Sequence, residues 1–169
     1  MERITLPNKG FTLIEVIAVL VLGGILTALA GLGVVKVTEG LVFAQKAAAT
    51  TLKAQMVLTR IEKELHIATS IASASTATSL TFVNNKGGGS ATYTLCLNGA
   101  YIDLAAGSDC AGGDHFVDNV TSLAFTYLAA DGATPAAPDA AKVIDMSFTL
   151  AGAGGTTSQF TMRVASRNL

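Results

Sequence analysis

An apolar run from Phe11 to Val35 constrains this chain more than any other feature, because it contains one carboxylate, Glu15, and no other charge. About 25 helical residues at ~1.5 Å each reach roughly 37 Å, enough to cross a bilayer core of about 30 Å with some tilt. A carboxylate within hydrocarbon costs at least ~2.5 kcal/mol on insertion scales, so it needs a partner. The run therefore predicts one membrane-spanning helix with a functional glutamate near its start.

A short basic leader joins this run through the string KGFTLIEV, which begins at Lys9. The string resembles the class III signal of type IV pilins and pseudopilins. The resemblance implies that a membrane aspartyl peptidase, the prepilin peptidase, cuts between Gly10 and Phe11 and methylates the new amine of Phe11. It also implies that Glu15 pairs with the Phe11 amine of a neighbouring subunit and sets the stagger of a fibre. Gly10 has no side chain and fits a narrow cleft in extended form, while Lys9 and Arg3 hold the leader in the cytoplasm.

Two other interpretations of the N-terminus compete with this one. An ordinary transmembrane helix with a stray glutamate is the plainer one, but it leaves the joint occurrence of leader, Gly, Phe and Glu unexplained. A secretory signal peptide would be followed by a small-residue cleavage site and removed entire, whereas here the apolar run stays. Major pilins usually have a Pro in this region. This run has none and instead holds Gly23, Gly24, Gly31 and Gly33.

Residues 36–72 are expected to continue the helix, because this stretch has no Pro and is rich in Ala, Leu, Lys, Gln and Glu. Its apolar residues recur at steps of three and four and predict one buried stripe. The stripe is Ala54, Leu58, Ile61, Leu65 and Ala68. We expect a single long helix whose first half anchors and polymerises while its second half packs on a sheet. The alternative is two helices broken between Gly31 and Gly40.

Beyond the helix the pattern changes to a period of two, which is typical of strands with one buried face. Turn signals rich in Gly, Asn, Asp and Pro separate the alternating segments, at residues 84–89, 98–99, 131–138 and 152–155. The alternating positions are Leu80 and Phe82; Tyr93, Leu95 and Leu97; Leu123, Phe125 and Tyr127; Ile144, Met146, Phe148 and Leu150; Phe160, Met162 and Val164. The sequence therefore predicts an α+β, pilin-like fold in which a long N-terminal helix, transmembrane and then amphipathic, packs on an antiparallel β-sheet meander.

This organisation divides the chain into four parts. Residues 1–10 are the leader peptide, 11–35 the transmembrane and polymerisation helix, 36–72 its amphipathic continuation, and 73–169 a periplasmic or extracellular β-sheet head. The segments FVDNVTSLAFTYLAADG and FTMRVASRNL also resemble, more loosely, J-type pseudopilins of type II secretion and related minor pilins.

Cys96 and Cys110 are the only two cysteines of the chain. An exported domain meets oxidising conditions, so we expect a disulfide between them, with two free buried thiols as the alternative. Closing this loop is worth ~3 kcal/mol in the chain-entropy model. A zinc site would need more ligands, because His115 is the one nearby imidazole and His66 lies on the helix.

Four aspartates lie in and just after the loop that the cysteines bracket: Asp103, Asp109, Asp114 and Asp118. Major pseudopilins of type II secretion bind calcium in their own loops, which makes Asp109, Asp114 and Asp118 candidate ligands. Their spacing matches no EF-hand, and Asp is an ordinary turn former. We therefore expect a solvated acidic loop without a metal, with calcium as the alternative.

Sequence motifs of catalysis are missing from the chain. It has no Gly-x-Ser-x-Gly elbow and no Walker loop, since KGGGS at residues 86–90 lacks the ordered Gly-Lys-Ser. The formal net charge is −1, and the scattered Lys and Arg residues form no stripe suited to DNA. We expect no enzyme, no cofactor and no nucleic-acid partner.

Two classes of function remain. The first is a structural minor pilin-like subunit of a type IV filament or a type II secretion pseudopilus, which assembles through its N-terminal helix with other pilin or pseudopilin subunits on an inner-membrane platform. The alternative is an adhesive or DNA-capturing pilin that acts as a binding module through exposed loops. In either class we expect a single-pass inner-membrane protein with its C-terminal head in the periplasm, which then enters the filament.

Overall fold

The structure is a computed structural model that describes residues 10–86 and 89–165. It divides into two compact units, Met1–Ala44 and Gln45–Leu169, which are described separately below. One helix is followed by eight strands and two short 3-10 helices within the described ranges. The elements are α1 (Leu13–His66), β1 (Ala68–Ile71), β2 (Ser79–Lys86), β3 (Gly89–Asn98), β4 (Tyr101–Ala106), β5 (Asp114–Val117), β6 (Val120–Leu128), η1 (Pro138–Ala140), β7 (Val143–Ala151), η2 (Ala153–Gly155) and β8 (Thr157–Ala165).

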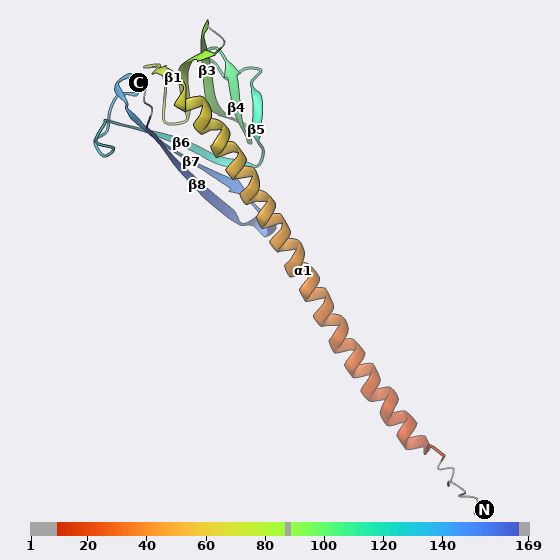
Figure 1. The fold of residues 1–169 in the computed structure, drawn as a ribbon. Coiled ribbons are helices and arrows are strands. Elements are labelled where there is room, and N and C mark those ends of the chain that lie inside the picture. Colours follow the sequence, from red (N-terminus) through yellow and green to blue (C-terminus); the bar gives the residue numbers. More distant parts are fainter. Residues whose placement is uncertain (1–9, 87–88, 166–169) are drawn as a thin grey trace, which may run out of the picture. The chain divides into compact units, whose positions relative to one another are not determined.

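The helix α1 is continuous from Leu13 to His66, which confirms one helix rather than two broken between Gly31 and Gly40 (Figure 1). Glycine lowers helix propensity but keeps its backbone N–H, so the hydrogen-bond ladder persists through these positions. Proline would remove that donor, and this stretch has none. Thr27 adds a local bond, because its Oγ1 donates to the carbonyl of Gly23 at 2.8 Å.

The helix ends earlier than the boundary at residue 72 that the sequence predicted. It stops at His66, and residues 68–71 form strand β1 instead. This strand pairs antiparallel with β2, placing Ile71 opposite Phe82, and both Ala68 and Ile71 are buried. The β-branched residues Thr69 and Ile71 favour a strand over a helix. The helix propensity of this segment is weak, and pairing with β2 stabilises the strand instead.

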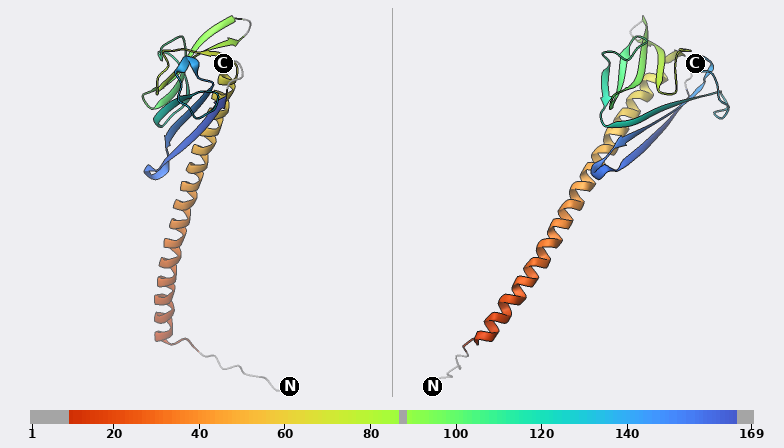
Figure 2. Two further views of the ribbon diagram at one scale, coloured as in Figure 1. Left: turned by 90° about the vertical axis from the view of Figure 1, so that its left-hand side faces the viewer. Right: turned by 180° about the vertical axis from the view of Figure 1, so that it is seen from behind.

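The strands form two antiparallel sheets rather than one (Figure 2). The first has the order β1-β2-β3-β4-β5 and the second the order β6-β7-β8, so each sheet is a meander in which sequence neighbours pair. Aromatic residues face each other across strands, as Phe82 does Tyr93 in the first sheet and Phe148 does Phe160 in the second. Such cross-strand pairs fix the register of both sheets.

A single hydrophobic core joins the two sheets to the helix segment of the second unit. Within this segment four residues are buried: Ala54, Val57, Ile61 and Leu65. The predicted stripe is therefore largely confirmed, with Val57 missed and Leu58 only partly buried. Phe82 of β2 and Phe148 of β7 are each about 1% exposed and represent the two sheets in this core.

Candidate processing and assembly site

The N-terminal end of α1 carries a hydrogen-bonded cap. The Thr12 carbonyl accepts the N–H groups of Glu15 at 3.1 Å and Val16 at 3.3 Å, and Thr12 Oγ1 also accepts from Glu15 N–H at 3.4 Å. Thr12 and Glu15 thus have the identities and spacing of a capping box, in which an N-cap hydroxyl serves the N–H three residues on. The role expected of Glu15 from the sequence lay only between subunits. The pattern Thr-x-x-Glu in the sequence is the signal for its second role, in capping the N-terminus of α1.

The residues of the expected cleavage site lie immediately before this cap. Gly10 and Phe11 are described as non-helical and exposed, with Phe11 81% exposed. Lys9 and the rest of the leader, residues 1–9, lie outside the described residues. The bond between Gly10 and Phe11 therefore precedes the first helical residue, Leu13, by two positions.

The helix surface of the first unit is apolar and exposed along its described length. Ile14 is 74% exposed, Leu20 70% and Leu32 68%, and no described residue of this unit is buried. One helix, α1, is long and apolar enough to cross a membrane by length and composition, with a mean hydropathy of 2.5 in its most apolar window. That much exposed hydrocarbon needs a covering phase, either lipid or the helices of other subunits.

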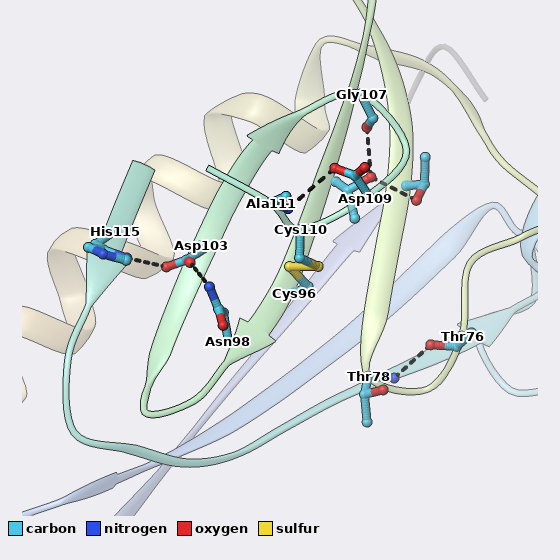
Figure 3. Close-up of a disulfide and its surroundings, with 12 residues drawn as sticks. Thr76, Thr78, Cys96, Asn98, Asp103, Gly107, Asp109, Cys110, Ala111 and His115 are labelled. Carbon is cyan, nitrogen blue, oxygen red and sulfur yellow. Dashed lines mark hydrogen bonds and ion pairs between the residues drawn. A yellow bond between two sulfur atoms is a disulfide. The ribbon is translucent and has the colours of Figure 1, made fainter. Parts of the chain in front are cut away.

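In the second unit, Cys96 and Cys110 form a disulfide, as the sequence predicted (Figure 3). Cys96 lies on β3 and is buried, while Cys110 belongs to the loop between β4 and β5. The bond closes a separation of 14 residues with the two Cα atoms 6.3 Å apart. It therefore fastens this loop to the middle of the five-stranded sheet.

The four aspartates around this loop do not converge. Asp109 accepts the N–H of Ala111 at 3.3 Å, Asp114 is exposed on β5, and Asp118 pairs with Lys53 at 2.7 Å. Among the described residues, no three His, Cys, Asp or Glu side chains are grouped so as to hold a metal ion. The carboxylates that would have bound calcium each have a separate local role or face solvent.

Asp103 differs from the other three because it is completely buried on β4. Its two carboxylate oxygens bind different partners, Asn98 Nδ2 at 2.9 Å and His115 Nδ1 at 2.5 Å (Figure 3). The His115 ring stacks on Tyr101 with centroids 4.5 Å apart. Asp103 is thus a structural carboxylate that orients an exposed imidazole, and its sequence position alone gave no sign of this.

Ion pairs and burial shift the pKa values of several titratable groups of the second unit. The Lys53 ammonium lowers the pKa of Asp118, and the Arg163 guanidinium lowers the pKa of Asp145 through two bonds of 2.6 Å. Burial raises the pKa of Tyr127 to about 12, and its hydroxyl donates to the carbonyl of Thr76 at 2.8 Å. These contacts tie α1 to residue 118, β7 to β8, and β6 to the loop before β2.

Comparison with known proteins adds one match, at the N-terminus. The model of the prokaryotic N-terminal methylation motif matches residues 6–31, which include the Gly10–Phe11 bond, the cap and Glu15. No curated protein matches the chain. The motif indicates a type IV pilin-like subunit, anchored in the membrane by its apolar N-terminal helix before assembly. It implies processing by the prepilin peptidase and assembly with other pilins, and its class is structural rather than enzymatic.

Proposed function

We propose that the chain is a structural subunit of a type IV filament or a type II secretion pseudopilus. The prepilin peptidase removes residues 1–10, Phe11 becomes the methylated N-terminus, and the head occupies the periplasm until assembly. The observation that carries this proposal is the methylation motif over residues 6–31, which coincides with the start of a helix whose apolar side chains are exposed throughout the described part of the first unit.

The exposed surface of the first unit supports assembly through this helix. The burial of apolar side chains such as Leu20, Leu26 and Leu29 stabilises an assembly by roughly 25 cal/mol per Å² of apolar area removed from water. Each of these leucines is more than 60% exposed. A bilayer covers them in the free subunit, and neighbouring helices replace the lipid in the filament. The same residues therefore serve as anchor and as polymerisation surface.

Glu15 supplies the electrostatic part of the assembly. Cleavage creates an amine four residues before this carboxylate, and both charges enter an apolar environment. An unpaired buried charge costs several kcal/mol, whereas a pair formed between subunits relieves both chains. We propose that Glu15 of one subunit binds the Phe11 amine of the next, while its own backbone N–H stays bound to Thr12.

A minor rather than a major subunit is the finer role that we propose. The looser likeness of the head segments to J-type pseudopilins and minor pilins supports it, as does the absence of the Pro usual in the helix of major pilins. The measurement is stoichiometry: quantitative mass spectrometry of purified filaments should find this chain at well under one copy per major subunit. An equal or larger amount would make it a major subunit.

Processing is tested by the mass of the mature N-terminus. Intact mass and N-terminal sequencing should give a chain that begins at Phe11 with one methyl group on its amine. The Gly10→Val variant should remain a full-length precursor in the membrane, because the branched side chain blocks the extended backbone from a narrow cleft. Gly10→Ala is the graded control. A mature start at any residue other than Phe11 contradicts the proposed site.

Assembly is tested by the Glu15→Val variant with Glu39→Val as its matched control. Both changes remove a carboxylate from the same helix, but Glu39 is exposed and paired with Lys36 at 2.9 Å. Glu15→Val should be inserted and processed but depleted from sheared filaments, while Glu39→Val should be incorporated normally. Normal incorporation of processed Glu15→Val would refute the intersubunit ion pair.

A further inference from the structure

Three cations follow one face of α1 in the second unit: Lys46, Lys53 and Arg60. They are spaced by seven residues, so they lie nearly above one another, about 10.5 Å apart along the helix axis. All three are exposed, and only Lys53 has an acidic partner, Asp118, among residues 10–86 and 89–165. We call these three residues the basic stripe.

The basic stripe borders two hollows that meet at Lys53 and Asp118. The first has a volume of about 530 Å³ and runs from Lys53 past Met56 and Arg60 to residues 115–117. The second, about 430 Å³, runs from Lys53 to Lys46 beside residues 150–154. Together they form a groove along α1 that is lined by hydrocarbon as well as cations, since Met56 is 66% exposed.

Side chains in the first hollow are held in place by other contacts. The Arg60 guanidinium stands over the Phe116 ring, 4.1 Å from its centroid, and this stacking leaves its edge donors free for a carboxylate. His115 is 60% exposed at its side chain and fixed by buried Asp103 on one side and by the Tyr101 ring on the other. The hollow thus presents positioned donors beside aromatic surface, which suits a polar segment with apolar neighbours.

We propose that this groove binds an extended, acidic segment of a protein partner. In an extended segment with polyproline II geometry every third side chain returns to the same face after about 9.3 Å, so acidic residues at every third position come close to the roughly 10.5 Å spacing of the basic stripe. Nucleic acid fits less well, because phosphates follow one another at about 3.4 Å of axis per strand and most would find no cation.

The proposal concerns the second unit alone and does not depend on assembly into a filament. Failure of cleavage or incorporation would therefore overturn the proposed function but not the proposed binding groove, which is tested separately by peptide binding.

The test is fluorescence anisotropy with the mature full-length chain in neutral detergent. The probe is a labelled peptide of sequence Glu-Val-Thr-Glu-Val-Thr-Glu, and its Gln counterpart is the uncharged control. We expect saturable binding of the Glu peptide that weakens as salt rises. Arg60→Gln and Lys46→Gln should each weaken it about two- to fivefold, as is usual for an exposed charge pair. Lys142→Gln removes an equal charge from an exposed site away from the groove and should leave binding unchanged.

Three results would overturn the proposal. They are the absence of saturable binding, equal weakening by Lys142→Gln, and tighter binding of an oligothymidylate with the same number of charges. Lys46→Gln guards against a folding artefact, because Lys46 is exposed and makes no ion pair in the described part of the chain, whereas Arg60 also packs on Phe116.

Discussion

The two ends of α1 are both helical but differ in the burial of their apolar side chains. In the first unit the helix exposes its apolar side chains on all sides, and no described residue there is buried. In the second unit it buries one stripe, with Ala54, Ile61 and Leu65 each at most 1% exposed. Burial within the chain decides which residues stabilise the fold, whereas exposure marks those reserved for lipid or for other subunits. Substitutions of similar chemistry at the two ends of α1 should therefore have different effects.

Ile61→Ala and Leu26→Ala should separate the two ends most strongly. Ile61→Ala removes buried methyl groups from the core and should lower the free energy of unfolding of the head by roughly 2–5 kcal/mol. Leu26→Ala changes a side chain that is 67% exposed and should leave the head's stability unchanged. Urea denaturation of the full chain in detergent, followed by the fluorescence of the head tyrosines, measures both. Equal effects would mean that the first unit stabilises the head.

The disulfide should give the next largest effect, again confined to the head. Replacing Cys96 and Cys110 by Ala removes a cross-link across 14 residues and should lower the free energy of unfolding by ~3 kcal/mol. Reduced wild-type protein lacks the bond but keeps both cysteine side chains, so it separates the effect of the cross-link from that of the substitutions. Membrane insertion should be unaffected, which a carbonate extraction would show. A double variant as stable as the oxidised wild type would contradict the assigned role of the bond.

Thr12→Ala should affect only the first unit, and by less. The variant loses the side-chain bond to Glu15 N–H, and loss of an N-cap typically costs ~1 kcal/mol of helix stability. Faster amide hydrogen exchange at residues 13–16 is the expected result, with unchanged exchange in the head. Thr12→Ser keeps the hydroxyl and serves as the control. Protection equal to wild type in Thr12→Ala would show that the cap does not hold this end.

Acidification should give the smallest effect, through ion pairs of the head. Since Arg163 lowers the pKa of Asp145, the pair stabilises the fold above the ordinary carboxyl pKa of about 3.9 and loses that contribution as pH falls through the lower folded value. Both side chains are partly exposed, so solvent screening limits the pair to less than ~1 kcal/mol. Asp145→Asn should flatten the stability profile between about pH 5 and pH 2. Asp114→Asn, which removes an exposed carboxylate, is the control and should not flatten it.

The sequence predicted those parts of the fold in which one period extends over many residues. The long helix, its buried stripe and the five segments that became β2, β3, β6, β7 and β8 all have such a pattern. The short strands β1, β4 and β5 did not, since Tyr101–Ala106 contains a buried carboxylate and β1 and β5 have four residues each. Their strand state depends on pairing with neighbours, which a local pattern does not record.

The candidate site divides in the same way. The methylation motif is a contiguous string, so it can be found in the sequence alone, and with only two cysteines in the chain the disulfide had one possible pairing. The bond of Asp103 to His115 and the stacking of Arg60 on Phe116 join residues of different elements, and only the folded chain brings them together. The seven-residue spacing of Lys46, Lys53 and Arg60 is visible in the sequence. That these side chains are exposed beside a groove is visible only in the structure.

The position of the cap has a consequence for the timing of maturation. Since the helix begins at Leu13, hydrolysis between Gly10 and Phe11 would break no helical hydrogen bond among the described residues and would require no unwinding of α1. The precursor can therefore complete its folding before it is cut, and cutting leaves the folded structure as it was. Under the proposed processing, the rate at which mature subunits are supplied is therefore set by encounters with the peptidase and includes no refolding step.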